Sequence, residues 1–247
     1  MGRRRTEAWL ASGVPWPPCL GRTAAEARWW KPQEHEGQED APSALHEERL
    51  DTVVQLLLGS GARRVLDLGC GSGALLERLL AEPHFTRIVG VDSCQMALGL
   101  ASQLRGSDPR GDRLSLRHGS FCEVDDDLCG FDAAAIVEAI EHVDPGHLSQ
   151  VERSVFTRIR PRLVVMTTPN REYNELLGMR EGELRHPEHR FEWTRWRFET
   201  WALGVGRRNG YGVAFDGIGP ASAWLGCPTQ AAIFRREEEA EEAHQRG

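Results

Sequence analysis

The chain lacks a long hydrophobic run. No window of its 247 residues approaches the roughly 18 consecutive apolar residues that a membrane span needs. With 40% hydrophobic and 27% charged residues, the composition is typical of a soluble globular protein. The length suits one domain with a well-filled core and is short for two. We therefore expect one soluble domain with no membrane partner.

The sequence also contains no CxxC motif and very little lysine. The six cysteines form no CxxC pair, which favours reduced thiols in the cytoplasm over a disulfide framework or a zinc knuckle. Lys31 is the one lysine, so arginine supplies the remaining positive charge. The formal net charge of -7 argues against an extended surface that coats nucleic acid, although it allows a small basic site. We expect a cytoplasmic protein without a DNA partner.

The two ends of the chain differ in composition from its middle. Residues 1–40 mix proline, glycine, arginine, glutamate and tryptophan without a steady period, which predicts a poorly ordered segment. Residues 237–247 form a charged tail whose expected role is solvation. Residues 41–236 remain as the expected domain.

Strand and helix patterns alternate along this domain. Helical apolar spacing occurs in residues 44–58, 73–82, 93–104, 146–158 and 195–210. Strand patterns occur in residues 63–70, 87–92, 114–120, 131–138, 162–170, 212–219 and 229–236. Such alternation predicts an α/β fold with a doubly wound, mostly parallel sheet, and the last two strands predict an antiparallel hairpin at one edge. Ligands of such a sheet bind at the carboxyl ends of its strands.

A glycine-rich loop follows the first of these strands. In "VLDLGCGSGALL" the GxGxG spacing is one residue shorter than the dinucleotide pattern, which favours a methionine-bearing nucleoside over a pyrophosphate. Asp92 ends the second strand, where a carboxylate can accept both hydroxyls of a ribose. Together these features resemble motifs one and two of class I S-adenosylmethionine methyltransferases. The resemblance implies S-adenosylmethionine as cofactor, held by Asp67, Gly69, Gly71, Gly73, Asp92 and Ser120.

Three costly polar groups end the apolar run "FDAAAIVEAIEHVDP". Glu138, Glu141 and His142 stand at i, i+3 and i+4, so we expect them on one face of a helical turn. Two carboxylates and an imidazole on one face are mutually unfavourable unless a divalent cation coordinates them. However, "EHV" followed by proline also occurs in class I methyltransferases that act on small molecules without a metal. These residues alone leave both alternatives open.

A second segment, "LRHPEHRFEWTRWRFETWA" at 184–202, falls on the same rim of the predicted sheet. From "GFD" through "EAIEH", "TTPN" and "HRFEWTR", residues 42–236 resemble the animal and plant Hen1 small-RNA 2'-O-methyltransferases. The match implies four metal ligands that act in catalysis through the metal: Glu138, Glu141, His142 and His189. His189 is chosen because it precedes the basic-Phe-Glu-Trp run, and His186 is interpreted as a loop residue.

The same resemblance implies a substrate and a reaction. It implies methyl transfer to the 2'-hydroxyl of the 3'-terminal nucleotide of single-stranded small RNAs, with piRNAs as the class that the animal relatives indicate. It also implies Mg2+, with Mn2+ or Co2+ suiting the two histidine nitrogens equally, and allows a small-RNA-loading protein as partner. Residues 151–210 hold 12 arginines against 8 acidic residues and are the candidate RNA-facing side, with a scattered solvated face as the alternative.

Several side chains and two rival functions stay open. Phe191 and Trp193 suit stacking on a base or packing in the core, and His118 and His147 are expected at the surface. One rival is a metal-independent small-molecule O-methyltransferase on the same fold. The other is a module that binds the cofactor or RNA without turnover.

Overall fold

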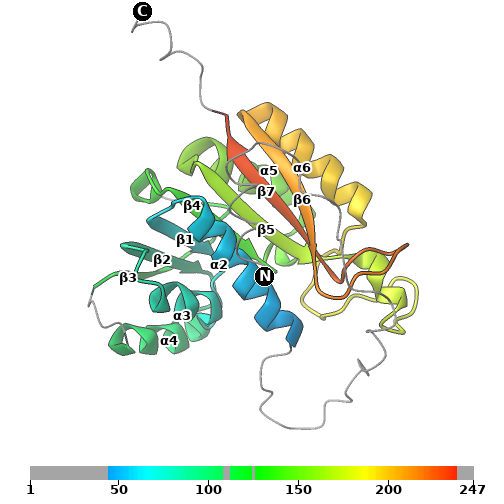
Figure 1. Ribbon diagram of the computed structural model, residues 1–247, viewed down its shortest axis with the longest axis horizontal. Coiled ribbons are helices and arrows are strands. Elements are labelled where there is room, and N and C mark those ends of the chain that lie inside the picture. Colours follow the sequence, from blue (N-terminus) through cyan, green and yellow to red (C-terminus); the bar gives the residue numbers. More distant parts are fainter. Residues whose placement is uncertain (1–43, 108–111, 124–125, 238–247) are drawn as a thin grey trace, which may run out of the picture.

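The computed structural model describes residues 44–107, 112–123 and 126–237. They form a central sheet with helices on both faces (Figure 1). The segment predicted to be poorly ordered, residues 1–40, lies outside the described residues, as does the predicted tail apart from Glu237. Among the described helices, none has the length and apolar character needed to cross a membrane.

Seven strands build the sheet, and their order is not the order of the chain. From one edge to the other they are β3 (Leu114–His118), β2 (Arg87–Asp92), β1 (Arg64–Leu68), β4 (Ala133–Val137), β5 (Leu163–Pro169), β7 (Thr229–Arg236) and β6 (Tyr211–Ile218). The first five are parallel, and β7 is antiparallel to both β5 and β6. The predicted doubly wound sheet with an antiparallel hairpin is therefore confirmed. Strands β2 and β3 lie on one side of β1, and β4 and β5 lie on the other side, so the strand order reverses at β1. This reversal places a ligand crevice at the carboxyl ends of β1, β2 and β4.

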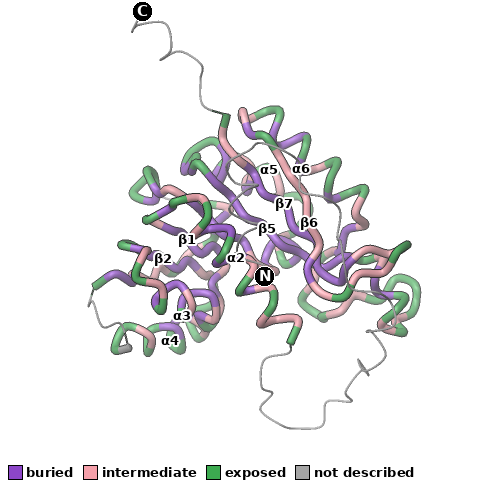
Figure 2. The backbone as a smooth tube through the Cα atoms, viewed as in Figure 1, coloured by how far each residue is buried: buried purple, intermediate pink, exposed green. Residues whose placement is uncertain are grey.

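The core is divided by the sheet because successive strand residues point to opposite faces. Val65 of β1 packs with helix α2 (Ala44–Gly59) and helix α3 (Ala74–Ala81). Leu66 and Leu68 pack on the other face, in the cluster that contains Phe198 of helix α6 (Arg195–Asn209). Figure 2 shows β5 and β7 as buried strands, the edge strand β6 as partly exposed, and the helices as exposed on their outer sides. Both faces of the sheet are thus covered, which explains why its strands carry nearly continuous apolar runs.

Two predicted helices differ from the observed ones. Helix α4 covers Gln95–Ala101 and continues as a 3-10 helix over Ser102–Ser107. The helix predicted at 146–158 consists of a 3-10 turn (Pro145–His147), helix α5 (Leu148–Val151) and a π-helical segment (Glu152–Ile159). The wider turns end where the Arg160 amide donates to the Val155 carbonyl, five residues back. The 3.6-residue pattern therefore located this helix but did not reveal its widening.

The connection from β5 to α6 is fixed against the end of the sheet. It includes a 3-10 turn, Arg171–Glu175, and ends at Thr194, whose side chain caps α6 by accepting a hydrogen bond from the Arg197 amide. The Gln230 side chain of β7 donates to the carbonyls of Pro169 and Trp193. These bonds hold the connection across the carboxyl end of β5, next to the residues that follow β4.

Candidate cofactor and metal site

A cavity of about 540 Å³ opens at the carboxyl ends of β1, β2 and β4. Of the predicted cofactor residues, Gly69, Gly71, Asp92 and Ser120 line it. Its volume falls within the range typical of small-molecule sites. The cavity occupies the crevice that the strand order predicts, so the fold offers a site for a nucleoside cofactor there.

The glycine loop is held in shape by the acidic residue at the end of β2. Asp92 accepts hydrogen bonds from the amides of Gly71 and Cys94, each at 2.7 Å. Gly69 has φ 83°, and a Cβ at this position would stand 2.6 Å from the Cβ of Ala139. A carboxylate offers about four lone-pair positions. Asp92 can therefore brace the loop and still accept the hydroxyls of a ribose.

Asp67 and Gly73 do not line the cavity. Gly73 begins helix α3 with φ 100°. Asp67 lies inside β1 with 2% exposure, and its Oδ2 has no hydrogen bond. Burial, and then the charge of Asp92, raise the pKa of Asp67 to about 7. A direct contact of either residue with the cofactor stays a prediction.

A cluster of potential metal ligands borders this cavity. Glu141, His142 and His189 offer ligand atoms that all lie within 4.8 Å of one another, and the rings of the two histidines are 4.9 Å apart. Glu141 is fully buried, and its Oε2 accepts a hydrogen bond from Thr168 at 3.0 Å while its Oε1 has none. Burial and the neighbouring Glu138 raise the pKa of Glu141 well above its usual value. An unpartnered carboxylate oxygen at zero exposure is costly unless a proton or a cation satisfies it.

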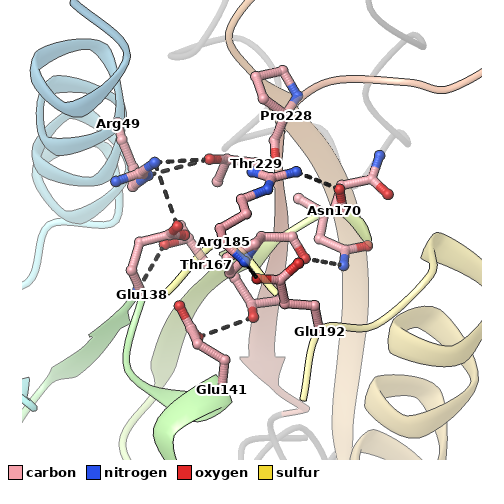
Figure 3. Close-up of polar contacts among 12 residues, drawn as sticks. Arg49, Glu138, Glu141, Thr167, Asn170, Arg185, Glu192, Pro228 and Thr229 are labelled. Atoms are coloured by element: carbon pink, nitrogen blue, oxygen red, sulfur yellow. Dashed lines mark hydrogen bonds and ion pairs between the residues drawn. The ribbon is translucent and has the colours of Figure 1, made fainter. Parts of the chain in front are cut away.

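Glu138 does not share the face of a helical turn with the other two, so that expectation was wrong. The 3-10 turn begins only at Ile140, because the Glu138 amide still donates to the carbonyl and side-chain oxygens of Thr167. Glu138 itself has φ 48°, in the left-handed region. Its Oε2 lies 3.4 Å from Arg49 Nη2, and its Oε1 is buried without a hydrogen bond (Figure 3). The structure thus brings three of the four predicted ligands together, with Glu138 beside them facing a guanidinium.

His189 is oriented by a residue that the sequence patterns did not reveal. Its Nδ1 lies 2.7 Å from Oε1 of Glu192, whose side chain is fully buried. Burial alone would raise the pKa of Glu192, but hydrogen bonds from His189, Asn174 and Arg185 lower it. The carboxylate is therefore ionised and accepts, so Nδ1 of His189 donates, and in the neutral ring Nε2 carries the free lone pair. Glu192 belongs to the "HRFEWTR" segment, and its position three residues after His189 was the available signal.

His186 lies close to His142 and His189, but its Nδ1 has a different hydrogen-bond partner from that of His189. Its ring is 5.9 Å from that of His142 and 5.6 Å from that of His189. With His142 and Glu188 it forms a second possible ligand group, in which all three residues are exposed. The Nδ1 of His186 accepts from the Glu188 amide at 3.2 Å. In the neutral ring the proton then resides on Nε2, which makes this nitrogen a donor rather than a ligand.

The remaining side chains singled out in the sequence have clear positions. Trp193 is 3% exposed and packs with Phe191, Phe198 and Trp201, so its position is in the core and not at a base-stacking surface. His118 and His147 are exposed, as predicted, and His147 lines the cavity. Several arginines of residues 151–210 form ion pairs with acidic side chains: Arg158, Arg162, Arg195 and Arg208. These pairs reduce the net positive charge at the surface of this region.

The strand order, the glycine loop and the acidic end of β2 define a class I S-adenosylmethionine-dependent methyltransferase domain. A family model described as a methyltransferase domain matches residues 65–162. The crystal structure of the methyltransferase domain of bacterial CtHen1 is 40% identical and superposes with a TM-score of 0.71, covering 78% of this chain and 100% of that one. The chain belongs to the Hen1 family of methyltransferases.

Curated relatives support the same assignment over part of their length. The small RNA 2'-O-methyltransferase of Mus musculus is 36% identical over 204 residues, which are 78% of this chain and 51% of that protein. The Arabidopsis thaliana protein of the same name is 31% identical over 213 residues, 78% of this chain and 23% of that protein. The chain therefore spans about half of the mouse relative and less of the plant one, and matches the methyltransferase domain that they share.

Proposed function

We propose that this chain transfers a methyl group from S-adenosylmethionine to the 2'-hydroxyl of the 3'-terminal nucleotide of small RNAs, in a reaction that requires a divalent cation. The observation that carries the proposal is the position of His142. It lines the cofactor cavity and also belongs to the ligand cluster with Glu141 and His189. A hydroxyl held at that cluster would therefore stand beside the methyl donor, as the reaction requires.

The cavity residues bind and orient the cofactor. The ribose hydroxyls would donate to Asp92, whose carboxylate is already fixed by two backbone amides. A Cβ added at Gly71 would meet no atom within 4 Å, so the backbone there leaves room for the ligand. Phe121 and Ala97 supply apolar walls, and Ser120 stands on the adenine side as the family resemblance implies. Nothing in this arrangement needs the loop to rearrange.

The donor set fits a divalent cation. Glu141 presents an unpartnered buried oxygen, His189 presents Nε2, and burial together with the neighbouring histidines lowers the pKa of His142, so its ring is neutral and able to ligate. Glu138 would complete the set if its carboxylate turned from Arg49. When bound there, a cation supplies Lewis-acid activation and orientation of a hydroxyl. Mixed nitrogen and oxygen donors suit Mn2+ and Co2+ as well as Mg2+.

The RNA is proposed to meet the chain at the rim that carries the cluster. Recognition of a chain end needs few phosphate contacts, so the overall negative charge does not oppose it. Arg190 is exposed and its amide donates to the Glu141 carbonyl, which places one arginine backbone directly at the cluster. We also propose piRNAs as the substrate class that the animal relatives indicate and a small-RNA-loading protein as partner. The cytoplasmic location is a separate prediction from the cysteines, which form no CxxC pair.

A labelled-methyl assay on small RNAs with three different 3' ends tests this function. We expect transfer to an RNA with an intact terminal diol and none to RNAs with an oxidised or a 2'-deoxy terminus. EDTA should abolish transfer, and Mn2+, Co2+ or Mg2+ should restore it. Synthetic RNAs of piRNA and shorter lengths, compared in parallel, test the substrate class.

Three results would contradict the proposal. Full activity on the diol RNA in EDTA would show that the cluster does not work through a cation. Methylation of small hydroxylated compounds in EDTA, without transfer to RNA, would favour the metal-independent small-molecule enzyme. Cofactor binding measured by calorimetry, together with no transfer to either substrate, would favour a binding module.

A further inference from the structure

We propose that Glu192 is a positioning residue of the cation site, which fixes His189 in the ring orientation and tautomer that present Nε2 to Glu141 and His142. The inference rests on the proposed function because it concerns the same site. Glu192 contributes no ligand atom to the described ligand groups. It acts through the 2.7 Å hydrogen bond between its Oε1 and Nδ1 of His189.

The Glu192 carboxylate is held by donors on both oxygens. Oε1 also accepts the Arg185 amide at 2.6 Å, and Oε2 accepts Nδ2 of Asn174 at 2.7 Å. An ionised carboxylate is an acceptor only, so each of these groups must donate to it. With its side chain at 0% exposure, no water competes for these positions. The oxygen that faces His189 is therefore held in one place by these contacts.

The partners of Glu192 are anchored in turn to the sheet (Figure 3). Arg185 Nε donates to Oδ1 of Asn174 at 2.6 Å, which determines which way the Asn174 amide points. The Arg185 guanidinium also donates to the carbonyl oxygens of Pro228 and Asn170. These contacts tie the loop that carries His189 to residues that follow β5 and precede β7. These contacts thereby fix the ring of His189 relative to the sheet, whose strand β4 precedes Glu141.

A glutamine at position 192 separates the role of the carboxylate from the role of packing. It has the same size, but its amide NH2 would face either Nδ2 of Asn174, or Nδ1–H of His189 together with the Arg185 amide. Asn174 cannot turn its oxygen without losing the bond from Arg185. The change therefore removes the charge beside His189 and one acceptor, without leaving a cavity. Loss of such an outer carboxylate typically weakens metal binding about 10–100-fold.

The matched control is Glu172. Its carboxylate also accepts three hydrogen bonds, from the amide, Nε and Nη2 of Arg195, and it lies in the same connection between β5 and α6. It contacts no histidine of the cluster in the described structure. Glu172→Gln removes a comparable carboxylate network and leaves His189 untouched.

The experiment measures Mn2+ binding and the His189 tautomer in the full chain. Loss of the free Mn2+ EPR signal gives the affinity of wild type, Glu192→Gln and Glu172→Gln. Long-range proton–nitrogen NMR of the metal-free proteins reports which ring nitrogen of His189 carries the proton. We expect Nδ1–H in wild type and Glu172→Gln, and a shift toward Nε2–H in Glu192→Gln. We also expect a roughly 10–100-fold weaker Mn2+ affinity for Glu192→Gln alone.

Three outcomes overturn the inference. The first is Nε2–H at His189 in the wild type, and the second is equal Mn2+ affinities in wild type and Glu192→Gln. A third outcome, equal losses in both variants, would also overturn it, because the effect would then be loosening of the connection. Failure of the proposed function has a different signature. In that case wild type binds no Mn2+ or transfers no methyl group to RNA, whereas the NMR result on the metal-free ring still decides the role of Glu192.

Discussion

The guanidinium of Arg49 lies 3.4 Å from the carboxylate of Glu138, so helix α2 supplies a positive charge beside the cluster that would hold a cation. Both side chains are largely buried, with 11% and 21% exposure. Arg49 also donates to the side chain of Thr229, which fixes the guanidinium between α2 and the start of β7. A divalent cation bound at the cluster would therefore compete with Arg49 for the same carboxylate.

Replacing Arg49 by glutamine should lower the stability of the metal-free protein and increase the stabilisation that Mn2+ provides. Breaking a buried ion pair from one side costs up to about 3 kcal/mol, because the remaining charge is uncompensated. The same change frees Glu138 and removes a repulsive charge, so Mn2+ affinity should rise. Thermal unfolding with and without Mn2+ should show a lower Tm for the metal-free variant and a larger Mn2+-induced increase than in wild type.

Arg78→Gln is the control for this experiment. Arg78 pairs with Glu47 and Asp51 on the outside of α2, away from the cluster. Arg78→Gln should change both the Mn2+-induced increase in Tm and the metal-free Tm by only a small amount. An Mn2+-induced Tm increase in Arg49→Gln that equals the wild-type increase would show that Arg49 does not compete with the cation.

Asp67 should make the folded protein less stable as the pH rises. Its pKa is raised from 3.8 to about 7 in the folded state by burial and then by Asp92. Between these values the folded state binds the proton and the unfolded state does not, so this contribution to stability is present below about pH 4 and is lost as pH rises through 7. The loss amounts to roughly 4 kcal/mol for a shift of this size. Urea unfolding of Asp67→Asn and wild type from pH 4 to 8 should show the variant gaining relative stability with pH.

Asp132 should change the pH dependence of stability in the direction opposite to that of Asp67. Burial alone would raise its pKa, but amides of Arg63 and Arg64 and the charge of Arg162 lower it. Its contribution is therefore present above the unfolded pKa and is lost as pH falls through the lower folded value. Asp132→Asn should lose stability relative to wild type near neutral pH and recover it in acid. If both variants changed with pH in the same direction, the assignment for Asp67 would be wrong.

Much of the fold was predictable because its signals are local. The apolar runs of β1, β4 and β5 and the glycines after β1 specify a covered parallel sheet with a loop at its carboxyl end. The helix predicted at 195–210 is confirmed as α6, which the structure shows to be capped by Thr194 at its start and by the left-handed Gly210 at its end. The widening over Glu152–Ile159 was not predictable, because a π-helical segment has no distinct apolar period at this length.

The site was predictable in its residue types and less so in its geometry. Spacing alone placed Glu138 on one face with Glu141, since it assumed a helix that starts at residue 138, whereas pairing with Thr167 delays the turn. The roles of Arg49 and Glu192 depend on contacts between α2, β4 and the loop before α6. Such contacts between distant segments have no periodic signature in one sequence. His186 and His189 likewise differ in burial, in their neighbours and in their hydrogen bonds to Glu188 and Glu192, none of which the spacing reveals.

Gly69→Ala should weaken both cofactor binding and stability. The left-handed backbone costs an alanine about 1–2 kcal/mol, and its Cβ would stand 2.6 Å from that of Ala139, which precedes the cluster. Gly119→Ala is the control, because Gly119 lines the same cavity, has no positive φ and has no atom within 4 Å of a Cβ position. Calorimetric titration with S-adenosylmethionine and thermal unfolding should separate them. Equal affinities for Gly69→Ala and wild type would show that the close approach to Ala139 does not shape the cofactor loop.

Loss of the His142 ring should remove cation-dependent methyl transfer, whereas loss of the neighbouring His147 ring should not. Both residues line the cavity, but of the two only His142 belongs to the cluster of potential ligands with Glu141 and His189 in the described structure. Because loss of an outer partner already costs about 10–100-fold in affinity, removal of a direct ligand should exceed this range. Transfer to diol-ended RNA, measured over a Mn2+ titration, should require far more Mn2+ for His142→Ala and the wild-type concentration for His147→Ala.

The same titration distinguishes a ligand from a residue that only shapes the cavity. If His142→Ala lowered the rate at saturating Mn2+ without changing the Mn2+ concentration needed, His142 would act on the substrate and not on a cation. S-adenosylmethionine affinity, measured without metal, should stay near the wild-type value in both variants, because neither ring contacts Asp92 or the glycine loop in the described hydrogen bonds. A joint loss of cofactor and Mn2+ binding in His142→Ala would mean that the cavity and the cluster fold as one unit and that the ligand assignment fails.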